Sequence, residues 1–232
     1  MRNSSSKAIL VLESPWELDD GNSNRTSVLP FVEGIAKLAG DTEVYHANFY
    51  DKKSFSQALN CLCKTKFKNT IIYISAHGYK HRIQKISIIE VLSRIGVKSN
   101  RFNITGVMLG SCFVGGKIEE ILNCIKDSNL RWVAGYSSSS KWLEGTMIDC
   151  NIISSMSNFD VEDFSDNCKM VKDFSQALPA FSNKFEIGED DHEKSISLEE
   201  SLKFYIQQTG KGYRPMEVTD LVFKERKLLQ LP

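Results

Sequence analysis

The sequence lacks an excess of either charge, and it lacks any long apolar run. Its 232 residues include 29 Lys and Arg and 29 Asp and Glu, a balance that argues against a broad nucleic-acid or anionic-membrane surface. No stretch is long enough to span a bilayer, and the first apolar run, which Glu13 interrupts, is too short for a secretory signal peptide. We therefore expect a cytoplasmic protein with neither a nucleic-acid nor a membrane partner.

A cysteine framework is also missing. Six cysteines in a chain of this length do not make the dense pattern of a disulfide-stabilised domain. Cys61 and Cys63 have neither the redox spacing nor the zinc-site spacing. Three more cysteines lie in apolar or helical patterns and are expected to be small core residues: Cys124, Cys150 and Cys168.

What the sequence does have is a regular alternation of apolar runs and amphipathic segments. The apolar runs are typical of strands buried on both faces, and they cover residues 7–13, 71–76, 104–109 and 130–136. Residues 42–50, which alternate in part, predict a further strand. Apolar residues at helical spacing predict helices at 28–39, 51–64, 86–95, 117–126 and 145–156. This order predicts an α/β fold, with a mainly parallel sheet and helices on both faces. We place this core at residues 1–158.

The pattern weakens in residues 159–232, which we expect to form an extension that packs on the core within one domain. Asn167–Leu178 is predicted to be a helix that ends before Pro179, and Glu186–Glu193 is predicted to be a solvated acidic loop. A capping-box pattern at Ser197 predicts a helix as far as Gln208. The last prediction for this region is an edge strand at Met216–Phe223.

Two of the predicted strands end at reactive side chains. The third strand is followed by His77 and Gly78, and the fourth by Ser111 and Cys112. Because the carboxyl ends of parallel strands meet in one crevice, we expect His77 and Cys112 to lie close together. The polar loop Ser14–Ser27 follows the first strand and is expected to border the same crevice.

An imidazole beside a cysteine serves nucleophilic catalysis. Cysteine attacks as the thiolate, and a nearby imidazole favours that form and can later protonate a leaving amine. Glycines beside the two side chains let a substrate carbonyl approach the backbone. The N–H groups of Gly78 and Cys112 are then candidates for an oxyanion hole.

These residues resemble a known group. His-Gly at the end of one strand, with Gly-Ser-Cys at the end of the next, resembles the caspase-like cysteine peptidases of clan CD, which include caspases, gingipains, separases and bacterial CHAT domains. The resemblance covers about residues 7–156 and implies a three-layer caspase-like fold. It implies that Cys112 is the nucleophile, His77 the catalytic imidazole and Gly78 an oxyanion donor.

The resemblance also implies a substrate and the residues that contact it. The substrate would be a protein or peptide, with a narrow range and often one dedicated partner in a signalling or defence cascade. In that family the strand after the cysteine helix lines the S1 pocket, which accepts the side chain preceding the cleaved bond, and pairs with the substrate backbone. The residues of this chain expected there are Tyr136, Ser137, Ser138, Ser139 and Trp142.

Two departures from the family pattern concern specificity. Gly110 stands where metacaspase-like members have an acid, and Ser137–Ser140 stands where several members with basic specificity have another. Cleavage after Lys or Arg is therefore not supported by the sequence, although Glu144 and Asp149 are within reach of the pocket. The caspase motif Gln-Ala-Cys-x-Gly is absent too, so specificity for Asp has no support either.

Three other interpretations remain open. Residues 111–118 lie between a strand and a helix as a nucleotide-binding P-loop does, but Ser111 and Ile118 break two of its four signature positions. A catalytically silent interaction module with the same fold is the second. The third is a metal site, because His81 follows His77 by four positions, but a strand end and the following turn do not share a helical face. We expect neither a metal nor a cofactor.

Overall fold

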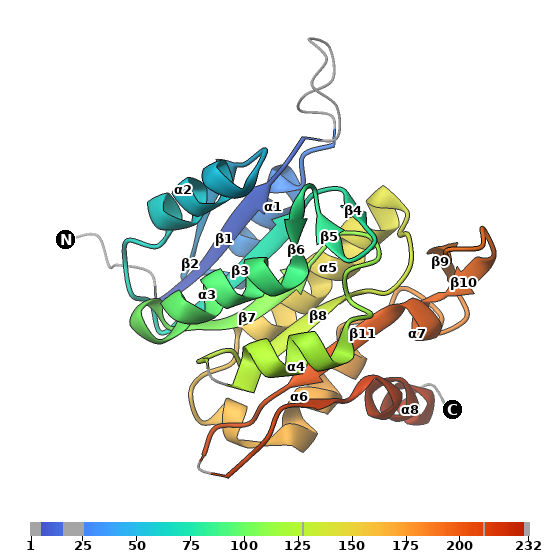
Figure 1. Ribbon diagram of the computed structural model, residues 1–232. Coiled ribbons are helices and arrows are strands. Elements are labelled where there is room, and N and C mark those ends of the chain that lie inside the picture. Colours follow the sequence, from blue (N-terminus) through green and yellow to red (C-terminus); the bar gives the residue numbers. More distant parts are fainter. Residues whose placement is uncertain (1–5, 16–25, 127, 211, 230–232) are drawn as a thin grey trace.

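A computed structural model describes residues 6–15, 26–126, 128–210 and 212–229 of the chain. A seven-stranded sheet runs through its centre in the order β12-β11-β8-β7-β3-β1-β2 (Figure 1). The five parallel strands are β1 (Lys7–Glu13), β2 (Thr42–Asn48), β3 (Asn69–Ser75), β7 (Ile104–Leu109) and β8 (Trp132–Tyr136). The sheet is completed by β11 (Leu202–Ile206) and β12 (Met216–Glu217), and β11 runs antiparallel to β8. The expected α/β fold with a mainly parallel sheet is confirmed.

Helices cover both faces of this sheet and enclose two apolar cores. One face carries α1 (Leu29–Ala39), α5 (Trp142–Ser157), α6 (Asn167–Gln176) and α8 (Thr219–Leu229). The opposite face carries α2 (Lys52–Leu62), α3 (Ile88–Phe102) and α4 (Ile118–Lys126). Four of the parallel strands, β1, β3, β7 and β8, are buried on both sides, and they therefore read in the sequence as continuous apolar runs. None of the helices in the described ranges has the length and apolar character needed to cross a membrane.

The expected site strands β3 and β7 are neighbours. All residues of both strands are buried, and their parallel register aligns Ile74 of β3 with Leu109 of β7. Both strands therefore deliver their carboxyl ends, and the residues that follow, to one edge of the sheet. Immediately after β3, three two-residue strands form a small antiparallel sheet: β4 (Gly78–Tyr79), β5 (Arg82–Ile83) and β6 (Ile86–Ser87).

The extension after residue 158 differs from three of the sequence predictions. The helix expected at Ser197–Gln208 is wrong: the capping box exists, but α7 stops at Leu198–Ser201 and the chain continues as β11. Tyr205 and Ile206 are fully buried beside β8, so pairing with the sheet overrides the local helix signal.

The other two differences also come from tertiary pairing. Glu186–Glu193 is not a loop throughout, because β9 (Glu186–Glu189) forms a hairpin with β10 (Ser195–Ser197). The strand expected at Met216–Phe223 is reduced to β12, since Val218 leads into α8, whose Val222 and Phe223 are buried in the core.

Two predicted helices have different bounds near a glycine: Gly96 was expected to follow the end of one helix, and Gly145 to begin another. Helix α3 passes through Gly96, which is buried near the Cys124 carbonyl, and ends at Asn103, which adopts a left-handed conformation with φ 52° and ψ 47°. Asparagine is one of the few residues that tolerates this cap. Helix α5 begins three residues before Gly145, at Trp142.

The close pairing of β7 and β8 generates a stability prediction. A methyl group on Gly106 would overlap the indole ring of Trp132, which is fully buried on the neighbouring strand. Gly106→Ala should therefore lower the free energy of unfolding by about 1–3 kcal/mol, measured by urea denaturation. The matched control is Gly34→Ala in α1, where nothing lies within 4 Å; it should raise stability by about 0.5–1 kcal/mol. Equal effects at the two positions would contradict this account.

Candidate active site

The structure brings the His77–Gly78 turn against the backbone of Cys112. A Cβ atom on Gly78 would overlap the carbonyl oxygen of Cys112 and would stand 2.8 Å from its nitrogen. This contact needs a residue without a side chain. His77 itself is exposed, and its carbonyl accepts a 2.8 Å hydrogen bond from the Gln84 N–H. The imidazole and the thiol therefore belong to adjacent segments at one edge of the sheet.

Cys112 lies in a loop that is tied to the segment after β8. Its side chain is half-buried, and Phe113 follows in a left-handed conformation with φ 59°. The Phe113 N–H donates to the Ser138 carbonyl at 2.9 Å, and the Gly115 N–H donates to the Tyr136 carbonyl at 2.7 Å. The hydroxyl of Tyr205 also donates to the Gly115 carbonyl, at 2.6 Å.

Ser140 is the residue that the sequence analysis did not select. Its backbone N–H donates to the Cys112 Sγ at 3.4 Å, and its Oγ lies 3.9 Å from the same sulfur. The signal in the sequence was the run of four serines directly after a buried strand, but the run gives no way to choose among its members. Only the alternation of the extended backbone decides which serine faces the cysteine.

The serines that were expected to meet a substrate instead contact the C-terminal extension. The Ser137 N–H donates to the Ser201 carbonyl at 2.8 Å, and the Ser139 N–H donates to the Glu189 carbonyl at 2.9 Å. Ser138 is fully buried, with its Oγ 2.5 Å from the Ser201 Oγ. The N–H groups of Ser137 and Ser139, which a substrate backbone would otherwise pair with, are therefore already bonded to the C-terminal extension.

Tyr136 and Trp142, two further residues expected to contact a substrate, are held by contacts within the chain. Tyr136 is completely buried, so its side chain is not accessible to a substrate. The structure corrects the expectation that it contacts one. Trp142 begins α5, where its Nε1 donates to the Thr26 carbonyl at 3.0 Å and its ring packs edge-on against Phe31. It ties the end of the Ser14–Ser27 loop to α1; residues 16–25 of that loop lie outside the described residues.

A buried carboxyl group lies directly behind the cysteine loop. Asp149 of α5 accepts hydrogen bonds of 2.8 Å from both the Tyr73 and the Tyr136 hydroxyls. Burial raises the pKa of Asp149 to about 7, although the two tyrosine hydrogen bonds oppose this shift. A Cβ atom on Gly110 would stand 2.6 Å from Asp149 Oδ2. The acid within reach of the pocket is therefore enclosed by Gly110 and two tyrosines.

The alternative interpretations meet obstacles in the same loop. In a P-loop the backbone N–H groups hold phosphates, but here those of Phe113 and Gly115 are engaged with the segment after β8. His81 lies over the loop, with its Nδ1 3.1 Å from the Phe113 carbonyl. Within the described ranges, no group of three or more His, Cys, Asp and Glu side chains is arranged to hold a metal ion.

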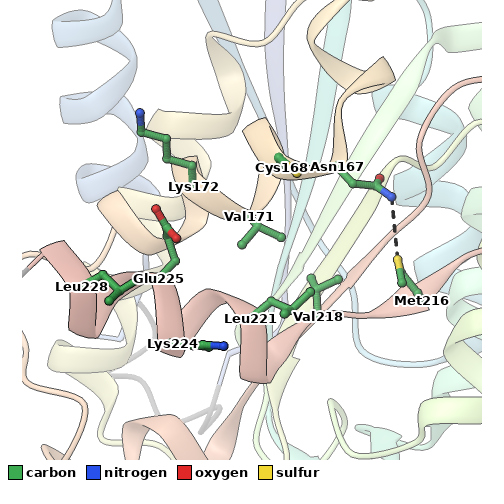
Figure 2. Close-up of a pocket in the computed structure, with 10 residues that line it drawn as sticks. All are labelled: Asn167, Cys168, Val171, Lys172, Met216, Val218, Leu221, Lys224, Glu225 and Leu228. Carbon is green, nitrogen blue, oxygen red and sulfur yellow. Dashed lines mark hydrogen bonds between the residues drawn. The ribbon is translucent and has the colours of Figure 1, made fainter.

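The other cysteines differ from Cys112 in their surroundings. Burial raises the pKa of the Cys63 thiol to about 11 and that of the Cys150 thiol to about 12, and it also raises the pKa of the Cys124 thiol. Cys61 and Cys168 are exposed, which corrects the expectation that Cys168 is a core residue. Cys168 lines a pocket of about 490 Å³ between α6 and α8 (Figure 2). The expected site residues do not line this pocket.

Comparisons with known proteins give structural similarity alone. No family model matches the sequence, and no curated protein matches it. Among solved structures, the chain is similar to iotapain, a secreted C11 cysteine protease from Bacteroides thetaiotaomicron, at 11% identity and a TM-score of 0.49, covering 76% of this chain and 63% of that one. It is also similar to Dronc, the Drosophila initiator caspase, at 9% identity and a TM-score of 0.46, covering 77% and 75% of the two chains.

The matched region thus spans less than two thirds of the length of iotapain. Both proteins are described as proteases, but similarity at these identities and TM-scores assigns neither a residue role nor an activity to this chain.

The contact between Gly78 and Cys112 can be tested by adding one methyl group. Gly78→Ala should displace the His77 turn from Cys112, because the group in its way is backbone, and should slow iodoacetamide labelling of Cys112 severalfold at neutral pH. Labelling is measured by peptide mass spectrometry and stability by thermal unfolding. Gly116→Ala is the control, since its nearest neighbour would be the Ser137 Cβ at 3.2 Å. Unchanged labelling in Gly78→Ala would show that the contact does not hold the site.

The buried Asp149 generates a pH prediction. Its folded pKa of about 7 exceeds the unfolded value, so the folded chain keeps a proton that the unfolded chain loses. Its contribution to stability is therefore lost as pH rises from about 4 to about 7. Relative to Asp149→Asn, the unmodified protein should lose on the order of a few kcal/mol of unfolding free energy across this range. Denaturation at several pH values measures this. Asp191→Asn, at an exposed position, should keep the original slope, and the same slope in Asp149→Asn would refute the prediction.

Proposed function

We propose that this protein is a cysteine endopeptidase in which His77 and Cys112 form the catalytic dyad. The observation that carries the proposal is the seating of Gly78 on the Cys112 backbone. This backbone contact supports the proposal because His77, which is exposed, directly precedes Gly78, and Cys112, which is half-buried, follows the adjacent parallel strand. Open α/β sheets bind ligands at such an edge.

The proposed reaction follows the chemistry of the two side chains. The Cys112 thiolate attacks the carbonyl carbon of the cleaved peptide bond, and the carbonyl oxygen becomes an oxyanion beside the backbone of Gly78 and Cys112. Collapse of this intermediate breaks the C–N bond, and protonated His77 transfers its proton to the leaving amine. Water then attacks the thioester with His77 as the base, which releases the acid product and restores the thiol. No third catalytic carboxylate is required.

The substrate class follows from the resemblance to clan CD peptidases and from the accessible side of the site. We propose a protein or peptide substrate with a narrow range, in keeping with a role in a signalling or defence cascade. Ser137 and Ser139 remain candidate contacts through atoms that the extension does not use. Asp149 does not favour a basic residue before the cleaved bond, because it is enclosed behind Gly110 and 2% exposed.

Cysteine and histidine replacements test the dyad. Cys112→Ala should abolish cleavage of a proteome-derived peptide library, read by mass spectrometry, and leave thermal stability nearly unchanged because the side chain is only half-buried. His77→Ala should reduce the cleavage rate by several orders of magnitude, since residues that act as a unit fail together.

Cys61→Ala is the matched control, since it removes an exposed thiol on α2. It should cleave the library as the unmodified protein does. Full cleavage activity in Cys112→Ala would overturn the peptidase proposal and favour the catalytically silent interaction module.

A further inference from the structure

The Cys112 sulfur receives two contacts from a single residue. The Ser140 N–H points at Sγ from 3.4 Å, within the range for a hydrogen bond to sulfur, and the Ser140 hydroxyl oxygen lies 3.9 Å from it. Donors gain most when their acceptor is charged, so both groups favour the thiolate over the thiol. The next helix, α4, begins only at Ile118, after the intervening loop. The Ser140 N–H and hydroxyl are therefore closer to the sulfur than the N-terminus of α4 is.

The direction of the Ser140 N–H is set by its neighbours in the chain. The N–H groups of Ser139 and Lys141 donate to the Glu189 and Ile187 carbonyls of β9, at 2.9 and 2.8 Å. The Glu189 N–H in turn donates to the Ser139 Oγ at 2.7 Å. Because successive N–H groups of an extended chain point to opposite sides, pairing with β9 turns the Ser140 N–H away from the hairpin and toward Cys112.

A second set of contacts fixes the distance between the two segments. The Ser138 carbonyl accepts a 2.9 Å hydrogen bond from the Phe113 N–H. Phe113 directly follows Cys112 in one segment, and Ser138 lies two residues before Ser140 in the other. Ser138 is itself held by the buried contact between its Oγ and the Ser201 Oγ. The sulfur and its donors are therefore fixed from both sides by the main chain.

We propose that Ser140 is a positioning residue that stabilises the Cys112 thiolate, and that strand β9 acts on the nucleophile through it. This inference rests on the proposed function, for which the thiolate is the attacking species. It gives the β9–β10 hairpin of the C-terminal extension a defined task. The hairpin holds an amide that donates to the Cys112 sulfur.

The test follows the rate of Cys112 alkylation by iodoacetamide as a function of pH, with the modified cysteine identified by peptide mass spectrometry. Ser140→Ala removes the hydroxyl and keeps the N–H, and it should shift the half-maximal pH of alkylation upward by about half a unit. At pH 7 the alkylation rate should fall about threefold, with the limiting rate at high pH unchanged. Ser140→Thr restores a hydroxyl and should recover the original profile.

The contribution of β9 is tested at Gly188. A Cβ atom there would overlap the Ser139 carbonyl, so Gly188→Ala should push β9 off the segment and shift the profile by about one unit, more than Ser140→Ala does. Asp191→Ala, at an exposed position of the same hairpin, is the control and should leave the profile unchanged. Thermal unfolding and circular dichroism confirm that each variant is folded, and Ser140→Ala decides the matter if Gly188→Ala is not.

The outcomes separate this inference from the proposed function. A shifted profile in Ser140→Ala with no peptide cleavage by the unmodified protein would sustain the thiolate role and sink the peptidase proposal. Cleavage by the unmodified protein with an identical profile in Ser140→Ala and Gly188→Ala would leave the dyad in place and overturn the role of Ser140. Failure of Ser140→Thr to recover the profile would assign the Ser140→Ala effect to packing and also overturn it.

Discussion

The candidate site depends on one backbone contact, the approach of Gly78 to Cys112. β3 and β7 bring their carboxyl ends to the same edge because they are adjacent and parallel, but adjacency alone leaves the side chains beyond the strand ends free to diverge. The missing side chain at Gly78 removes that freedom, since the turn after His77 rests directly on the cysteine backbone. The small sheet β4-β5-β6 then holds the turn from the other side. Rotamers contribute little to this geometry, which makes it a rigid base for the two reactive groups.

The C-terminal extension belongs to the same construction. It adds β11 to the sheet beside β8, and the Tyr205 hydroxyl of that strand reaches the Gly115 carbonyl in the cysteine loop. It also supplies β9, which pairs with Ser139 and Lys141. The cysteine loop is therefore braced by a residue ninety positions away in the sequence. Stability of the extension and order at the sulfur are linked through these contacts.

The sequence predicted what depends on continuous apolar runs and failed where partners decide the structure. Four of the five parallel strands, all but the edge strand β2, were found because burial on both faces leaves an unbroken apolar record, as in Ile104–Leu109. Residues 202–206 carry no such record. Their preference for a helix after a good N-cap is reversed only by pairing with β8, which the sequence does not display. Gly96 illustrates the opposite error. Its low helix propensity predicted the end of a helix, but the helix continues through this glycine, which packs near the Cys124 carbonyl.

The same division applies to the site residues. The positions of His77, Gly78 and Cys112 at one edge of the sheet were predictable because each follows a recognisable strand, and parallel strands fix which end they share. Ser140 was not, because its role depends on the phase of an extended segment whose alternate N–H groups are taken by β9. Tyr136 was assigned to the substrate by the resemblance to clan CD peptidases. Its position at the end of a strand is visible in the sequence, but its hydroxyl bond to Asp149 is not.

Asp149 bears on our proposal that Cys112 acts as a thiolate. The Tyr136 hydroxyl interacts electrostatically with both Asp149 and Cys112. Burial raises the pKa of Tyr136, and the charges of Asp149 and Cys112 raise it further. A second full negative charge behind the loop would oppose ionisation of the thiol. Burial counters this by raising the pKa of Asp149 to about 7, so that the carboxyl is protonated in a substantial part of the molecules at neutral pH. The two tyrosine hydroxyls keep the acid satisfied in either state, because each can donate to an oxygen or accept its proton. The enclosure that removes Asp149 from the pocket is thus also what limits its electrostatic opposition to the nucleophile.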